Sequence, residues 1–355
     1  MIDLYSKVIT QYEQNLPFVI YNKPNNKKII GIFQENDHLY YAKSFNEAGF
    51  IMAAFDSNTS PILIPADKSE VIIEKFKKNN SKLDKSSVEK TQNEGAKNAF
   101  EALVSKAIKD IEGGFFNKVV LSRKELVDIP DFDLIQLFEK LLNSYASAFT
   151  YCWFHPKVGL WMGATPEQLL KAKGDHFKTV ALAGTQKYRD TEEVLWENKE
   201  KEEQQFVTDF ILDNLKGVTT EILVSSPYTT RAGSLLHLKT DIRGTLNPSF
   251  SLKQVLDILH PTPAVCGLPK IIAKDFILEH EGYDRTFYTG FLGELNKCFG
   301  NGKNNTDLYV NLRCMSIKDS QATLFIGGGI NKGSVPEKEW IETVNKSMIM
   351  KKIIN

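Results

Sequence analysis

Two pairs of glutamates have a spacing that could support metal chemistry: Glu339 with Glu342, and Glu200 with Glu203. Residues three apart lie on one side of a helix, so each pair repels itself unless it faces water or shares a cation. Glu203 continues the apolar side of its predicted helix, where a carboxylate is costly without a partner. Two such pairs would supply the oxygen ligands that suit Mg²⁺. An ordinary solvated acidic surface is the alternative for each pair.

Three consecutive glycines, Gly327–Gly329, follow an apolar stretch near the end of the chain. Glycine lets a ligand approach the main chain closely. Neither a GK[ST] sequence nor a G-x-G-x-x-G sequence opening a βαβ unit accompanies them, which argues against a phosphate loop. Their N–H groups could still bind a carboxylate, with a simple tight turn as the alternative. Ser334 and Glu337 have the spacing of a capping box, which predicts a helix starting near Pro336.

Lys118 lies in the apolar stretch KVVLSR, which predicts a buried strand. Burial disfavours the ammonium form, and a downward shift of roughly 3 units from about 10.4 would let Lys118 act as a base at neutral pH. Alternatively, the amine reaches water along the strand. Glu167 follows Pro166 and could be an acid at a helix start.

Arg313, Tyr288 and His260 are polar residues in otherwise apolar stretches. An arginine in such a strand requires a buried anion, and a carboxylate is the anion that a guanidinium binds best. For a lone histidine, a hydrogen-bonded place in the core is the default interpretation.

The composition narrows the class of protein. The 355 residues include 44 basic and 44 acidic side chains, so no overall field favours nucleic acid or an anionic membrane as a partner. Four scattered cysteines without a C-x-x-C pair indicate free thiols in a reducing compartment, and therefore a cytoplasmic location. The first residues resemble no signal peptide, and no stretch approaches a membrane span.

The order of elements predicts an α+β fold. Short β-like runs fill residues 1–76, and the polar segment 77–95 is predicted as a linker. Strands mixed with amphipathic helices, among them 133–144, 192–215 and 336–352, fill the region 96–355. Because βαβ repeats are few, large antiparallel sheets are favoured over a doubly wound fold.

An ordered series of segments resembles the chorismate-utilising enzymes, which include isochorismate, salicylate, anthranilate and aminodeoxychorismate synthases. The resemblance covers roughly residues 100–346. The segments are KVVLSR (118–123), GATPEQLL (163–170), ALAGT (181–185), the acidic helix around Glu200 and Glu203, LHPTPAVCGLP (259–269), RTFYTG (285–290), NLRC (311–314), GGGI (327–330) and EWIET (339–343). The family's fold is a large α/β sandwich of antiparallel sheets with outer helices, and we expect that fold here.

The resemblance also implies roles for individual residues. Mg²⁺ would be bound by Glu203 and Glu342, with Glu200 and Glu339 beside them, and would hold the ring carboxylate of chorismate. The residues expected to contact the substrate are Arg313, Tyr288, Gly328 and Gly329 at the enolpyruvyl carboxylate, Gly184, Thr185 and His260 on the ring side, and Lys346. Lys118 would be the general base and Glu167 the acid that protonates the departing C4 hydroxyl.

Lys118 also indicates which family activity to expect. Members that add water at C2 resemble this chain in having this lysine, which anthranilate synthases typically lack. Aminodeoxychorismate synthases carry a lysine where this chain has Ala183. We therefore expect isochorismate synthase activity in menaquinone or siderophore synthesis, from a monomer or weak dimer. Salicylate synthase and an inactive chorismate-binding protein are the alternatives. Three departures from the family are QKYRD after the AGT turn, Gln204 where many relatives have histidine, and a short N-terminal half.

Overall fold

Two large antiparallel sheets form the framework of the computed structural model, which describes residues 3–76, 93–188, 191, 193–232 and 235–354. The first sheet has nine strands in the order β15 (Gly267–Leu268), β7 (Lys118–Asp128), β19 (Gln321–Ile330), β18 (Cys314–Lys318), β9 (Gly159–Thr165), β8 (Phe149–His155), β1 (Phe18–Asn22), β2 (Lys28–Gln34) and β6 (Ser69–Lys75).

The second sheet has ten strands, and one of them, the hairpin strand β13 (Tyr228–Ala232), pairs with β14 beside the main path. The order of the other nine strands is β12 (Thr219–Val224), β14 (Leu235–Leu246), β11 (His176–Lys187), β10 (Gln168–Lys173), β17 (Thr306–Val310), β16 (Phe291–Leu295), β4 (Gly49–Ala53), β5 (Ile62–Pro65) and β3 (Tyr40–Tyr41). Strands from 3–76 occur in both sheets, so the first part of the chain is built into the same sandwich.

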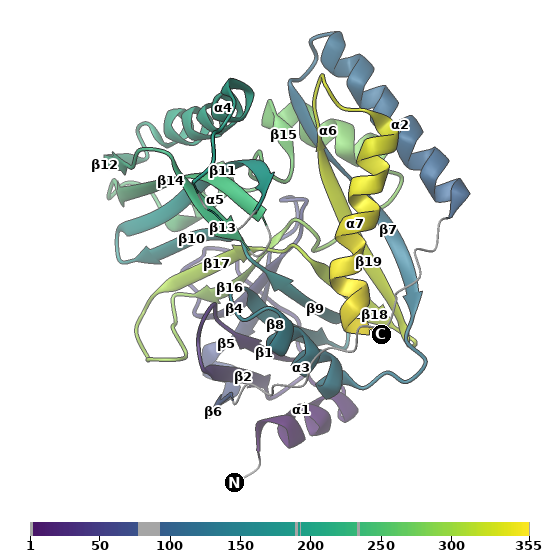
Figure 1. Cartoon of the computed structure of the whole chain (residues 1–355). Helices are drawn as coiled ribbons and strands as arrows, with labels where there is room; N and C mark the ends of the chain where they lie inside the picture. Colours follow the sequence, from purple (N-terminus) through teal and green to yellow (C-terminus); the bar gives the residue numbers. More distant parts are fainter. Residues whose placement is uncertain (1–2, 77–92, 189–190, 192, 233–234, 355) are drawn as a thin grey trace.

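Helices cover the outer faces of the sheets (Figure 1). They are α1 (Leu4–Glu13), α2 (Glu94–Glu112), α3 (Leu134–Ser144), α4 (Asn198–Leu215), α5 (Leu252–Leu259), α6 (Lys270–His280) and α7 (Pro336–Ile354), with a short 3₁₀ helix at Ala66–Lys68. Helix α7 lies along β19 with α2 beside it, and α4 lies on β11 and β14. Strands such as β8 are buried at every position because one face meets the other sheet and the opposite face meets helices.

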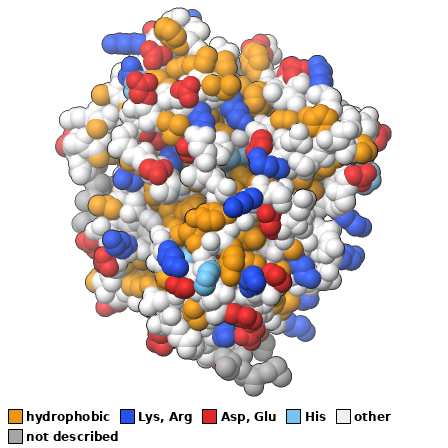
Figure 2. All heavy atoms as spheres, turned by 180° about the vertical axis from the view of Figure 1, so that it is seen from behind, with side chains coloured by type: hydrophobic (Ala, Val, Ile, Leu, Met, Phe, Trp, Pro, Cys, Tyr) orange, Lys and Arg blue, Asp and Glu red, His pale blue; other side chains and the backbone are white. Residues whose placement is uncertain are grey.

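The packing confirms the predicted α+β sandwich. An aromatic-rich core that includes Tyr21, Trp153 and Phe287 lies between the sheets, and separate clusters lie beneath α3 and beneath α4 and α5. The four cysteines are buried and unpaired, as expected. No helix in the described part of the chain is long and apolar enough to cross a membrane. The face in Figure 2 carries acidic and basic side chains interspersed, in keeping with the balanced charge.

Several local predictions differ from the structure. Helix α4 begins at Asn198 instead of residue 192, because Glu197 and Glu200 form a capping box there. Ser334 accepts a hydrogen bond from Asn331 N–H (3.2 Å), so this serine closes the turn before α7 and its proposed capping box with Glu337 is wrong. Glu167 starts no helix and lies between β9 and β10.

The segment 77–95, predicted as a linker, falls mostly outside the described residues. Helix α2 begins at Glu94, and Asn93 caps it by accepting a hydrogen bond from Ala96 N–H (3.0 Å). The last two residues of the predicted linker therefore belong to a helix.

Candidate active site

Lys118 begins β7, and its side chain lies over Gly329 of β19. The two strands are in register, with Val120 opposite Gly329. A Cβ at Gly329 would lie 3.1 Å from Cε of Lys118, so glycine is needed there to give room for the lysine. Burial lowers the pKa of Lys118, while the carboxylates of Glu203 and Glu167 oppose that shift and Lys346 adds to it. Lys118 is therefore a desolvated amine within electrostatic range of residues from three other segments.

Glu167 is the matching acid. Burial raises the pKa of its carboxyl to about 7, against the opposing charges of Arg313 and Lys118. The residue sits in the connection between two strands of different sheets and lines a cavity with Thr262 from the Pro-rich loop. A carboxyl with this pKa is about half protonated at neutral pH, so a substantial fraction of the molecules can donate a proton.

The raised pKa of Glu167 makes a prediction about stability. Between pH 4.5 and about 7 the folded chain holds a proton that the unfolded chain releases, so stability falls as pH rises through this window. We expect Glu167→Gln to be more stable than the wild type at pH 8 by about 3 kcal/mol, with no difference near pH 4. Urea denaturation at both pH values measures this. An equal or lower stability of the variant at pH 8 would contradict the burial of a charged carboxylate.

Glu339 and Glu342 lie at the start of α7 beside the middle glycine. A Cβ at Gly328 would lie 3.7 Å from Oε2 of Glu339 and 3.9 Å from Oε1 of Glu342, so both carboxylates approach the same point of the main chain. Lys346, one turn further along α7, donates to Oε1 of Glu342 (2.7 Å) and to the carbonyl of Gly327 (3.0 Å). A cation therefore already neutralises one of these two carboxylates.

The two glutamates of α4 have different surroundings. Glu203 is half-buried and lies within electrostatic range of Lys118, which places the start of α4 and the start of α7 around the same amine. Glu200 is the third residue of its helix, and its carboxylate accepts hydrogen bonds from Glu197 N–H (2.7 Å) and from Gln186 (3.3 Å). Capping the helix thus explains Glu200 without a metal.

The oxygen donors can be tested as a magnesium site. Among the described residues no three His, Cys, Asp or Glu side chains converge closely enough to hold a metal ion. Mg²⁺ commonly takes one or two carboxylates and completes its shell with water and ligand oxygens. Glu339 and Glu342 offer two carboxylates at one point, and Lys346 shows that a cation is accommodated there. The donor set at the start of α7 therefore fits Mg²⁺.

Arg313 and Tyr288 lie on the other sides of this region. Burial lowers the pKa of Arg313, and Glu167 is among the groups that oppose the shift. Tyr288 stacks on Phe325 of β19 with ring centres 5.5 Å apart. A Cβ at Gly327 would lie only 2.7 Å from the hydroxyl of Tyr288, so the first glycine provides the room for this phenol. The three glycines thus make space for Tyr288, for the α7 carboxylates and for Lys118 in turn.

The residues expected on the ring side are divided. Gly184 has φ +68° and packs between Trp196 and Glu200, where α4 meets β11. The side chain of Thr185 lies outside the described part of the chain. His260 packs edge-on against Phe291, and its Nε2 lies 3.2 Å from the carbonyl of Ala54. Burial lowers the pKa of His260 to about 3, so this histidine is neutral and has the contacts of a core residue.

His237 was missed by the sequence analysis. It lies on β14, and its Nδ1 is 2.9 Å from the carbonyl of Gly184, which can only accept, so Nδ1 carries the proton. Burial lowers the pKa of His237, and the charges of Arg313 and Lys346 lower it further. The histidine therefore faces the same region as both cations. The sequence feature that could have singled it out is its place in the stretch LLHLKT, a predicted strand in which apolar and polar residues alternate.

Comparison with known proteins identifies the family of the chain. Residues 51–355 match the sequence model of a family described as chorismate binding enzyme. The chain is 32% identical over 265 residues to the salicylate biosynthesis isochorismate synthase of Pseudomonas aeruginosa, and 31% identical over 256 residues to the isochorismate synthase EntC of Escherichia coli. These matches cover 72% and 69% of this chain. The chain belongs to the chorismate-binding enzyme family.

The matches also show how far the likeness extends. They take in 54% of the Pseudomonas aeruginosa protein and 64% of the Escherichia coli protein, so the chain matches only part of these relatives' lengths. The menaquinone-specific isochorismate synthase MenF of Escherichia coli superposes with a TM-score of 0.78 at 21% identity, over 96% of this chain and 89% of that chain. This last similarity establishes the shared fold.

Proposed function

We propose that the protein is an isochorismate synthase, which converts chorismate reversibly to isochorismate. The observation that carries the proposal is the pairing of Lys118 with Glu167. Both are desolvated, each lies within electrostatic range of the other, and burial moves their pKa values toward neutrality from opposite sides. A lowered lysine pKa and a raised glutamate pKa are what a general base and a general acid require.

In the proposed reaction, neutral Lys118 removes a proton from water as the water oxygen bonds to C2 of the ring. Both ring double bonds shift by one position, the C4–O bond breaks, and Glu167 gives its proton to the departing hydroxyl, which leaves as water. One water is consumed and one released, so nothing is oxidised or reduced. Lys118 ends with an extra proton and Glu167 lacks one, and transfer of a proton between them, directly or through water, restores the starting state.

The remaining residues hold the substrate. Arg313 and Tyr288, beside the glycines of β19, are suited to bind the enolpyruvyl carboxylate, because a buried guanidinium requires an anion. Glu339 and Glu342 would supply the two carboxylates that bind Mg²⁺ directly, and Glu203 would contribute through a water ligand of the ion. Bound there, the ion would neutralise the ring carboxylate of chorismate next to these acids.

The lysine also favours water over ammonia as the nucleophile. Ammonia is nucleophilic without deprotonation, whereas water at neutral pH needs a base. The names of the two relatives reported above, both isochorismate synthases, support the same choice.

The proposal is tested by incubating the purified protein with chorismate and Mg²⁺ and separating the products by chromatography. Isochorismate is expected, in a mixture that approaches the same composition from either side. Salicylate together with pyruvate would show that the elimination follows at the same site. Calorimetric binding of chorismate without any product would overturn the assignment of an enzyme.

We expect the Mg²⁺ concentration that the enzyme requires to depend on the carboxylate of Glu342. Glu342→Gln removes a charge from the donor set, so we expect the Mg²⁺ concentration for half-maximal activity to rise by about 10-fold to 100-fold. Titration of activity with MgCl₂ measures the shift. Glu337→Gln, which removes a glutamate from the first turn of the same helix, is the matched control. Equal Mg²⁺ requirements in both variants and the wild type would exclude Glu342 as a ligand.

A cytoplasmic location, a monomeric or weakly dimeric state, and a place in menaquinone or siderophore synthesis stay predictions. The similar solved structures include one described as a menaquinone-specific and one described as a putative 2,3-dihydroxybenzoate-specific isochorismate synthase. Their names therefore do not choose between the pathways.

A further inference from the structure

Strand β7, which carries Lys118, has an incomplete partner on one side. On its inner side it pairs along its length with β19, but on its outer side β15 pairs only with Val119 and Lys118. The last backbone bond from that side runs from Val120 N–H to the carbonyl of Cys266 (2.8 Å). Beyond this point the carbonyl of Val120 and the N–H of Ser122 have no neighbouring strand, and buried backbone groups need partners.

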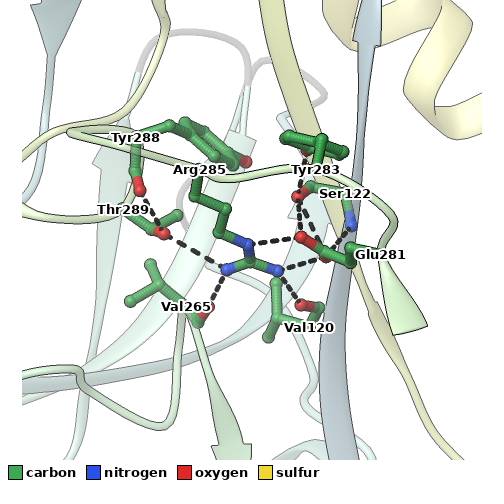
Figure 3. Close-up of polar contacts among 8 residues, drawn as sticks. All are labelled: Val120, Ser122, Val265, Glu281, Tyr283, Arg285, Tyr288 and Thr289. Carbon is green, nitrogen blue, oxygen red and sulfur yellow. Dashed lines mark hydrogen bonds and ion pairs between the residues drawn. The ribbon is translucent and has the colours of Figure 1, made fainter. Parts of the chain in front are cut away.

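A buried ion pair takes the place of the missing strand (Figure 3). Arg285 Nη2 donates to the carbonyl of Val120 (2.6 Å), and Glu281 Oε1 accepts from Ser122 N–H (2.7 Å). Arg285 and Glu281 bind each other through Nε to Oε2 (2.7 Å) and Nη2 to Oε1 (2.5 Å). Together they continue the hydrogen-bond ladder of β7 with side chains.

The pair is fully enclosed and well satisfied. Both side chains are 1% exposed. The remaining N–H groups of Arg285, on Nη1, donate to the carbonyl of Val265 (3.1 Å) and to the hydroxyl of Thr289 (3.2 Å). Burial alone would lower the pKa of Arg285, but the Glu281 carboxylate raises it above its usual value. Removing one member of such a pair strongly destabilises the folded protein, because the other charge then stays buried without a partner.

The same guanidinium therefore joins three segments that reach the site. Val120 is two residues from Lys118 on β7. Val265 belongs to the loop that contains Thr262, which lines the Glu167 cavity. Thr289 follows Tyr288, whose ring lies 5.8 Å from the guanidinium. The pair can therefore fix the positions of Lys118, of Tyr288 and of the loop that lines the Glu167 cavity. It does so without contacting the substrate.

We infer that Arg285 and Glu281 are positioning residues: they hold the outer edge of β7 and the Tyr288 turn so that the base and the carboxylate-binding phenol keep a fixed relation. If the pair supplied only stability, its substitution would not disturb the structure of these segments locally. The charge alone is insufficient, because the fork of five N–H groups makes the three connections.

The test compares Arg285→Lys and Glu281→Gln with Glu294→Gln. The control breaks a different buried ion pair, in which Lys23 Nζ binds Glu294 Oε2 (2.5 Å) and Asp307 Oδ2 (2.9 Å). All are measured well below their melting temperatures. We expect kcat of the two site variants to fall about 100-fold, because even a small displacement of a catalytic group from the reacting atoms has an effect of this size. The control variant is expected to keep the wild-type kcat. Amide hydrogen exchange, measured by mass spectrometry, should accelerate in peptides covering 117–123 and 285–290 of the site variants only.

Ser122→Ala extends the test if a charged-pair variant does not fold. It removes the hydroxyl bonds to Glu281 (3.0 Å to each oxygen) and to Tyr283 (2.7 Å) but keeps the backbone bond to Glu281. Faster exchange at 117–123 with a smaller fall in kcat supports the inference. Site variants with the same kcat and the same local exchange as the control would overturn it. The kinetic measurement rests on the proposed function, whereas the hydrogen-exchange measurement does not. A failure of the positioning role can therefore be distinguished from a failure of the proposed function.

Discussion

Lys118→Ala is expected to lower kcat for the formation of isochorismate by about 10²- to 10⁴-fold, the usual contribution of a positioned general base. The lysine is desolvated at the start of β7, its pKa is lowered by burial, and it lies over Gly329, where any other residue would crowd its side chain. Alanine leaves the pocket open to water but removes the group that accepts the proton. Steady-state kinetics with a chromatographic product assay measures the loss.

Two controls separate a missing base from a damaged site. Lys124 lies on the same strand and is exposed, so Lys124→Ala should leave kcat unchanged. Calorimetry should show that Lys118→Ala still binds chorismate in the presence of Mg²⁺. If Lys118→Ala turns over chorismate as fast as Lys124→Ala does, another group removes the proton from water and the role given to Lys118 is wrong.

Glu167→Gln is expected to cause a loss of the same order in kcat, for the complementary reason. The amide keeps the shape and hydrogen-bonding capacity of the carboxyl but cannot protonate the departing hydroxyl. In the wild type the acid must be protonated, so the rate should fall as pH rises through about 7, the pKa to which burial raises Glu167. On the acid side the rate should rise as Lys118 loses its proton. A pH profile of kcat/KM measures both limbs.

Exposed Glu279→Gln is a suitable control for the loss of a glutamate, since its carboxylate is 75% exposed. It should retain both the rate and the profile of the wild type. If the rate of a residually active Glu167→Gln variant still falls near pH 7, a group other than Glu167 is responsible for that part of the pH profile. The increased stability expected for Glu167→Gln at pH 8 is an independent sign that the wild-type carboxylate is costly to bury.

Much of the fold could be predicted from the sequence. Local signals determine where an apolar strand or an amphipathic helix occurs, and the stretches around Lys118, at 133–144 and after Pro336 carried them clearly. Ends of helices were harder. Glu200 was interpreted as a metal ligand because of its distance from Glu203, yet the backbone N–H of Glu197 uses its carboxylate. The choice between a cap and a ligand depends on where the helix starts, and that was predicted six residues too early.

Contacts between distant segments could not be read from the chain. The carbonyl that binds His237 belongs to Gly184, and the pairing of β11 with β14 brings the two together. Arg285 appeared only as the first residue of RTFYTG, and nothing in that stretch shows that it completes the edge of β7. The three glycines were singled out correctly as a place of close approach, but which side chain each of them admits depends on how β19, α7 and the Tyr288 turn pack.

The central claim is that Lys118 activates a water molecule for C2 while Glu167 expels the hydroxyl from C4. The most direct measurement is turnover of chorismate with Mg²⁺ in ¹⁸O-labelled water, followed by mass spectrometry of the isochorismate at early times. The mechanism predicts one ¹⁸O atom in each product molecule, at the C2 hydroxyl, and none in unreacted chorismate at the start. Isochorismate that retains only the original oxygen would contradict it, since the hydroxyl would then have moved within the substrate without water from the solvent.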